Sequence, residues 1–133
     1  ESVGQPADAM ALYREAVRLD RASGKPQADT LLPGARLLLL LNQLEESEGW
    51  LREAVQLAPK SRDAHFDLAR VLLKKGDPST AAAEGEFSLT LSEGVTTDAA
   101  IHYLLIRAWQ QAGASDKAAM HASVIRALEG ARP

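Results

Sequence analysis

The 133-residue sequence contains no cysteine, and only 5% of its residues are aromatic. Without cysteine the chain forms no disulfide and no thiolate metal site, but this leaves its redox compartment open. With so few aromatic residues, leucine, alanine, valine and isoleucine must supply most of any core. The absence of cysteine and the scarcity of aromatics thus exclude some sites and restrict the core, but they do not predict a fold.

Long apolar runs and an excess of positive charge are also missing. The longest apolar run, residues 37–41, is far shorter than the roughly 18 to 20 residues that a bilayer-spanning helix needs, so we expect no membrane insertion. The formal net charge is −3, which leaves no broad basic surface to neutralise a phosphate backbone. The sequence therefore predicts no nucleic-acid partner.

Apolar residues recur at helical spacing almost throughout, and alternating β-branched runs are absent, which predicts an all-α protein. Stop and turn signals divide the chain into seven predicted helices, and the short turns favour antiparallel neighbours. These signals lie at residues 23–26, 42–43, 58–59, 76–78, 92–94 and 112–113.

The predicted helices repeat. Shifting HFDLARVLLKKG (65–76) by 37 residues reaches HYLLIRAWQQAG (102–113), which matches histidine with histidine, arginine with arginine and glycine with glycine. Moving back 34 residues from Ala69-Arg70, Leu72 and Gly76 reaches Ala35-Arg36, Leu38 and Asn42. The three extra residues of the later interval fall in the polar loop around residues 92–97, where we expect an insertion to cost little.

This pattern resembles the tetratricopeptide repeat, a helix-turn-helix unit of 34 residues. The resemblance rests on Leu68, Ala69, Leu72, Gly76 and Ala81 and on the equivalent residues of the neighbouring units. It covers nearly the whole chain and implies an α-solenoid of antiparallel helix pairs, wound as a right-handed superhelix. We expect one domain over residues 1–133, with an unpaired helix at 7–22 and repeats at 28–59, 62–92 and 97–129.

Several residues depart from the repeat pattern, so other αα-hairpin repeats remain an alternative. His65 and His102 replace the usual aromatic residue, and Asn42 stands where a turn glycine is expected. Pro33 lies inside an expected first helix, which should therefore start late or kink.

Caps and core residues follow from the same assignment. Ser61 is expected to cap one helix and Asp77 the next, which has Pro78 at its first position. The predicted core contains Leu68, Leu72, Leu105, Trp109, Ala54 and Ala118.

The polar residues suggest no catalytic, cofactor or metal site. His65, His102 and His121 have no partner at metal-ligand spacing, so we expect packing roles for them. Glu84 and Glu86 are expected to form a solvated helix face rather than a carboxylate pair. The sequence thus predicts neither an enzyme nor a bound cofactor.

Three arginines share one repeat position. Arg36, Arg70 and Arg107 lie on the first helices of the three complete units, and the resemblance implies that this position faces a concave groove. Because arginine binds carboxylates in bidentate fashion, the ladder could hold an acidic peptide or the C-terminus of a chain. Alternatively each arginine pairs with a nearby acid, as Arg70 could with Asp67. The complete set of groove candidates is Arg36, Arg70, Arg107, Phe66, Tyr103, Lys74 and Gln110.

Two functions are compatible with this reading. The first is a non-enzymatic protein-interaction module whose groove binds a peptide or a partner helix. The second is a structural segment of a longer array, or a homo-oligomer, that stacks through its terminal helices. Those helices lack a partner in sequence, so Leu12, Val17, Val124 and Leu128 are expected to be partly exposed or covered by another chain.

Overall fold

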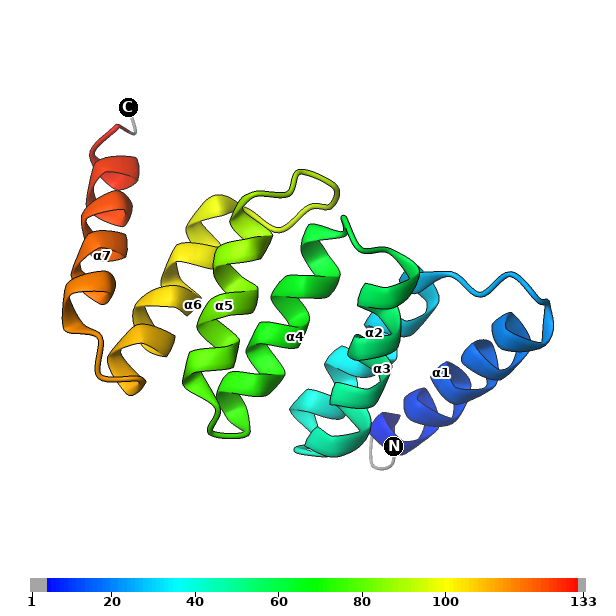
Figure 1. Ribbon diagram of the computed structural model, residues 1–133. Helices are drawn as coiled ribbons and strands as arrows, with labels where there is room; N and C mark the ends of the chain where they lie inside the picture. Colours follow the sequence, from blue (N-terminus) through cyan, green and yellow to red (C-terminus); the bar gives the residue numbers. More distant parts are fainter. Residues whose placement is uncertain (1–4, 132–133) are drawn as a thin grey trace. The chain divides into compact units, whose positions relative to one another are not determined.

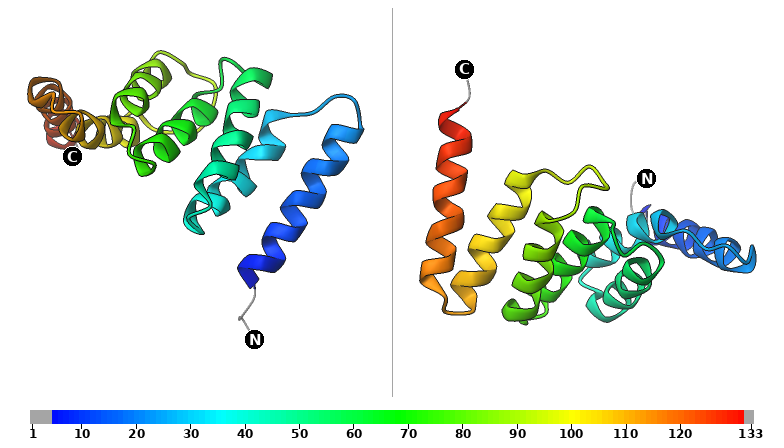
Figure 2. Two further views of the ribbon diagram at one scale, coloured as in Figure 1. Left: turned by 60° about the horizontal axis from the view of Figure 1, so that its bottom comes forward. Right: turned by 45° about the horizontal axis from the view of Figure 1, so that its top comes forward.

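The computed structural model describes residues 5–131. Over this range the chain forms seven α-helices and no β-strand, as the sequence predicts (Figures 1 and 2). The helices are α1 (Gln5–Ala22), α2 (Ala28–Leu40), α3 (Leu44–Leu57), α4 (Arg62–Lys74), α5 (Pro78–Leu89), α6 (Asp98–Gln111) and α7 (Ser115–Gly130).

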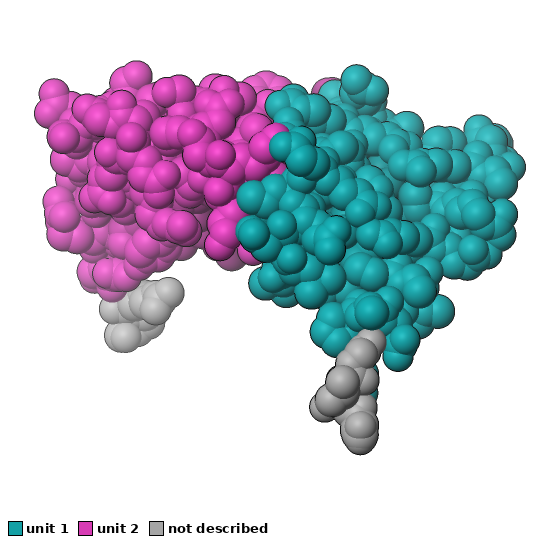
Figure 3. All heavy atoms as spheres, turned by 90° about the horizontal axis from the view of Figure 1, so that it is seen from below, with its two compact units in different colours: residues 1–59 teal, residues 60–133 magenta. Residues whose placement is uncertain are grey.

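The chain divides into two compact units, Glu1–Pro59 and Lys60–Pro133 (Figure 3). In the first unit α2 packs against both α1 and α3. In the second unit α4 packs on α5, α5 on α6 and α6 on α7, and α4 also touches α6. Within each unit, every helix thus packs against one or two helices that adjoin it in sequence, which is the packing of an α-solenoid.

The helix α2 begins at Ala28 and continues through Pro33 to Leu40, so the expected late start is wrong. A proline removes one N–H donor and crowds the carbonyl four residues before it, which weakens a single turn. Tertiary packing supports this turn. Gly34 lies so close to Trp50 of α3 that an added Cβ would stand 2.3 Å from its ring.

Each helix pair turns through a residue with left-handed backbone conformation. The φ angles are 61° at Asn42, 90° at Gly76 and 82° at Gly113. Asparagine tolerates this conformation better than other residues with a side chain, so Asn42 does replace a turn glycine.

Side-chain caps begin α4 and α5 of the second unit. The Ser61 hydroxyl accepts a hydrogen bond from the Ala64 amide at 3.1 Å, and the Asp77 carboxylate accepts one from the Thr80 amide at 3.3 Å. Both caps are as predicted, and each satisfies an amide that has no partner within the helix.

Most of the predicted core is buried, namely Leu68, Leu72, Leu105, Ala54 and Ala118. Trp109 is the exception, because its side chain is only half-buried. Its indole N–H donates to Glu86 at 3.0 Å, and the Lys117 ammonium lies 4.3 Å from the ring centroid. These two polar partners keep the indole at the surface, so its assignment to the core is wrong.

Candidate functional site

Six of the predicted groove residues lie on α4 and α6 of the second unit. On each helix they recur every three or four residues, which places them along one side of that helix. Two are half-buried and four are exposed. We call this set the α4–α6 stripe: Phe66, Arg70 and Lys74 on α4, and Tyr103, Arg107 and Gln110 on α6.

Arg70 is partly engaged within its own helix. Its guanidinium lies 3.6 Å from the Asp67 carboxylate and 6.0 Å from the centre of the Phe66 ring. The pairing with Asp67 considered from sequence is therefore present, but the Arg70 side chain is still 38% exposed. Arg107 is exposed and, within residues 5–131, forms no ion pair. Both guanidinium groups thus retain donors that face solvent.

The remaining arginine of the ladder, Arg36, lies half-buried on α2. It belongs to the first unit, whereas Arg70 and Arg107 belong to the second. A surface shared by all three arginines therefore stays a prediction.

The histidines connect neighbouring helices. His65 Nδ1 lies 2.7 Å from the Glu84 carboxylate, and its ring packs edge-on against Phe87. His102 Nδ1 lies 2.7 Å from His121 Nδ1. The shift of 37 residues that relates the repeats carries the first pair onto the second, so both pairs join equivalent positions of an α-helix hairpin.

The two glutamates of α5 do not form a solvated face, so that expectation is wrong. Glu84 bonds to His65 of α4, while Glu86 bonds to Trp109 of α6 and to His121 of α7 at 2.8 Å. The reason is their position. α5 packs between α4 and α6, and residues two apart on a helix point toward different neighbours.

Burial lowers the pKa of His102 from its ordinary value, and the adjacent His121 lowers it further. Asp98 and Glu86 oppose this shift in pKa. One of the two facing Nδ1 atoms must be unprotonated to accept the hydrogen bond. The bond between the rings therefore exists only while the pair carries at most one positive charge.

Residues 90–97, between α5 and α6, form a loop that is held by the first residue of α4. We call this segment the 90–97 loop. Arg62 forms a 2.7 Å ion pair with Asp98, and its side chain is largely buried. Its guanidinium also donates to the carbonyl oxygens of Ser88, Leu89, Leu91 and Thr96.

The next residue, Asp63, holds the other side of the 90–97 loop. Its carboxylate accepts hydrogen bonds from the amides of Val95 at 3.1 Å and Thr96 at 2.9 Å, and from the Thr96 hydroxyl. Sequence reasoning treated this loop as a tolerant insertion and missed both contacts. A signal was present, since the following repeat has Ala99 and Ala100 at the positions of Arg62 and Asp63.

The terminal helices α1 and α7 expose apolar side chains. Leu12 is 72% exposed, Met120 is 55% exposed and Leu128 is 43% exposed, while Val124 is half-buried. Val17, in contrast, is only 2% exposed, so its expected exposure is wrong. It lies on the buried side of α1, the helix that packs on α2.

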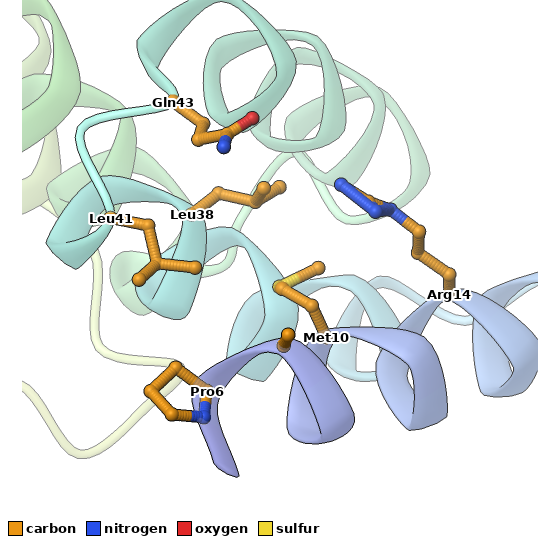
Figure 4. A pocket seen from close by; sticks show the side chains of 7 residues that line it. Pro6, Met10, Arg14, Leu38, Leu41 and Gln43 are labelled. Atoms are coloured by element: carbon orange, nitrogen blue, oxygen red, sulfur yellow. The ribbon is translucent and has the colours of Figure 1, made fainter. Parts of the chain in front are cut away.

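A pocket of about 470 Å³ lies within the first unit (Figure 4). It was not predicted from sequence. Its lining comes from Pro6, Ala7, Met10, Arg14, Leu38, Leu41 and Gln43. The guanidinium of Arg14 is bonded to Glu46 at 2.7 Å, so the charged group of the lining is already paired. The pocket is therefore mainly an apolar recess between α1 and the end of α2.

Residues 5–131 offer neither a metal site nor a membrane-spanning helix. No group of three or more histidine, aspartate or glutamate side chains there could hold a metal ion. None of the described helices combines the length and hydropathy needed to cross a membrane.

Neither a protein-family model nor a curated protein sequence matches the chain. Solved structures do match. MamA superposes with a TM-score of 0.74 at 19% sequence identity, over 90% of this chain and 66% of that chain. BtubC (BKLC) from P. vanneervenii superposes with a TM-score of 0.80 at 21% identity, over 98% of this chain and 60% of that chain.

At these identities the similarity is one of fold. This chain spans about two thirds of the length of MamA and 60% of the length of BtubC. Together with the packing of α1–α7, the matches establish an all-α helical-repeat protein built as an α-solenoid.

Proposed function

We propose that this chain is a non-enzymatic protein-interaction module of the tetratricopeptide-repeat type, which binds a peptide or partner helix along the α4–α6 stripe. The observation that carries the proposal is the repetition of the stripe. Phe66 and Tyr103 are equivalent aromatic residues, and Arg70 and Arg107 are equivalent cations, on two first helices that touch. Side chains repeated in this way suit an elongated ligand, because each repeat offers it the same chemistry.

The family assignment is supported by details of the repeat. Ala35 and Ala69 are fully buried, as required where two helices approach closely, and Asn42, Gly76 and Gly113 share the left-handed turn. The similarity to MamA, a longer chain, supports the helical-repeat fold that this proposal requires.

The charges of the stripe favour an acidic partner. Arg70, Lys74 and Arg107 contribute three cations, and the neighbouring carboxylate, Asp67, is buried against Arg70. Arginine donors that face solvent are well suited to carboxylates. We expect binding to weaken as salt is added, because these exposed charges are screened.

Charge reversal tests the site. Peptides selected from a displayed random library on the native protein would be measured by fluorescence anisotropy against the double variant R70E/R107E. We expect at least a tenfold loss of affinity. The matched control R52E/R126E makes the same change in net charge on the second helices α3 and α7 and should lose less than about twofold. Equal losses in both variants, or unchanged binding in the first, would exclude the stripe as the binding surface.

A second function, association through the terminal helices, is favoured by the exposed apolar side chains of α1 and α7. Leu12 on α1 and Met120 on α7 are both more than half exposed. Large apolar side chains that gather at the surface often mark an interface. Under this alternative the chain acts as a structural segment that stacks on further repeats or on a second copy.

A further inference from the structure

The 90–97 loop makes many hydrogen bonds for a surface connection. The Arg62 guanidinium donates to two carbonyl oxygens within the loop and two at the end of α5, and the Arg62 amide donates to the Glu93 carbonyl at 2.7 Å. The Asp63 carboxylate accepts hydrogen bonds from two amides of the loop. A Cβ on Gly94 would stand 2.7 Å from the Asp63 carboxylate. The loop therefore packs tightly on the start of α4, where Arg62 and Asp63 restrict its conformation.

This fixed loop presents an apolar side chain to solvent. Val95 is 87% exposed although its amide is bonded to Asp63. Exposed loops positioned by a rigid scaffold often carry binding residues, because little conformational entropy is lost when a ligand docks. The side chain of Val95 makes none of the hydrogen bonds that hold the loop to Asp63, which use the amides of Val95 and Thr96 and the Thr96 hydroxyl.

Val95 lies at the aromatic end of the α4–α6 stripe. Asp63, which bonds the Val95 amide, precedes Phe66 by three residues and so lies on the same side of α4. Along α4 the stripe runs from Phe66 to Arg70 to Lys74, and along α6 from Tyr103 to Arg107. The hydroxyl of Tyr103 donates to Glu129 at 2.8 Å, which fixes that ring. The stripe thus has an apolar end beside the loop and a cationic end away from it.

The carboxylates at the loop end reinforce this polarity. Asp63 and Asp98 are already bonded to the loop amides and to Arg62, and Glu93 is exposed on the loop. A ligand carboxylate is therefore disfavoured beside Val95 and favoured beside Arg70, Lys74 and Arg107. A partner should therefore place an apolar residue at the loop end of the stripe and its carboxylates at the cationic end.

We propose that the 90–97 loop and the α4–α6 stripe form one recognition surface for an acidic peptide segment, with an apolar residue of the ligand seated at Val95, Phe66 and Tyr103. The rise of about 1.5 Å per helical residue puts Arg70 about 6 Å and Lys74 about 12 Å beyond Phe66. An extended peptide advances about 3.3 Å per residue, so its carboxylates should lie about two and four residues from the apolar residue. This inference rests on the proposed function, which it extends to a ligand pattern.

Synthetic peptides test the pattern directly. A labelled peptide in a Gly-Ser background carries one leucine with aspartates two and four residues after it, and a second peptide has the reverse order. In matched peptides serine replaces leucine, or asparagine replaces both aspartates. We expect binding by one leucine-aspartate order, at least fivefold weaker binding after the leucine is replaced, and at least tenfold weaker binding after the aspartates are replaced.

Protein variants locate the two halves of the pattern. V95S should weaken the leucine-aspartate peptide about fivefold and leave the serine-aspartate peptide unchanged, whereas the control M120S, at another exposed apolar residue, should change neither. R70E/R107E should weaken both peptides. If V95S affects both peptides equally or neither, the loop is not part of the surface, although the stripe remains supported by R70E/R107E. If no peptide of the set binds the native protein, the ligand pattern is wrong, and the library selection with R70E/R107E then decides the proposed function separately.

Amide hydrogen exchange tests whether Asp63 orders the 90–97 loop. In native protein the amides of Val95 and Thr96 should exchange with solvent deuterium at least tenfold more slowly than in D63N, in which the charged acceptor is lost. Binding of the leucine-aspartate peptide should weaken in D63N while that of the serine-aspartate peptide is retained. Unprotected amides in the native protein, or equal peptide affinities in D63N and native protein, would contradict the proposal that Asp63 holds the loop in its binding conformation.

Discussion

At the scale of single residues, truncation of Leu72 in α4 tests whether the repeat assignment identifies buried positions correctly. The Leu72 side chain is 3% exposed. Truncation to alanine removes buried methyl groups and leaves a cavity, so L72A should lower the free energy of unfolding by about 2 to 5 kcal/mol. Urea denaturation would measure this change. The control L40A, at a leucine that is 77% exposed, should stay within about 0.5 kcal/mol of the native protein. A similarly small change in L72A would contradict the assigned packing.

The lowered pKa of His102 makes stability depend on pH. Between the lowered folded pKa and the ordinary unfolded value of about 6.5, the unfolded state binds more protons, so stability rises with pH. The contribution of His102 is complete above the unfolded pKa and is lost as pH falls through the folded pKa. Urea denaturation between pH 7.5 and 5 should show the difference in unfolding free energy between native protein and H102Q shrinking as the solution becomes acidic. A constant difference would contradict the lowered pKa of His102, whose main cause is burial.

At the scale of helices, two glycines of the first unit provide a matched pair. Gly34 in α2 is pressed against Trp50, whereas Gly49 in α3 has no atom within 4 Å of an added Cβ. G34A should therefore force the helices apart and destabilise the protein by about 1 to 3 kcal/mol. G49A should stabilise it by about 0.5 to 1 kcal/mol, because alanine restricts the unfolded chain and favours a helix. Thermal melting of both variants would test the close approach of α2 and α3, and equal shifts in the same direction would contradict it.

The helices could be predicted from sequence because the information for them is local or periodic. The apolar spacing around Leu68 and Leu72 identified a buried helix face, and the cap at Ser61 and the left-handed turn at Asn42 depend on residues close in the chain. The late start expected from Pro33 was wrong because packing from α3 supports this helix, and no local rule contains that packing.

The polar contacts between helices could not be predicted in the same way. Glu86 meets His121 across 35 residues, and Asp63 meets Thr96 across 33. Their partners are set by the relative rotation and rise of packed helices, to which hydrophobic periodicity is insensitive. The candidate stripe was identified by repeat equivalence alone, whereas the 90–97 loop that borders it became apparent only from these long-range bonds.

At the scale of the whole molecule, the two proposed functions require different apolar surfaces to bind a partner. Groove recognition requires Val95, Phe66 and Tyr103 to remain accessible in the free protein, while stacking requires the outer faces of α1 and α7 to be covered in the assembled state. Leu12 and Leu19, seven residues apart on α1, are 72% and 54% exposed and lie on one side of the helix. Exposed apolar faces of this kind are unfavourable in water unless they mark an interface.

Sedimentation therefore separates the two functions. If the terminal helices stack, the native protein should associate as its concentration rises from about 10 μM to 1 mM, and L12Q/L19Q should remain monomeric because polar side chains disfavour burial of the α1 face. The control L40Q alters an equally exposed leucine of α2 and should associate like the native protein. R70E/R107E should also associate normally, since it changes only the stripe. A native protein that stays monomeric at 1 mM would count against stacking between copies, and loss of peptide binding in L12Q/L19Q would contradict the separation of the two surfaces.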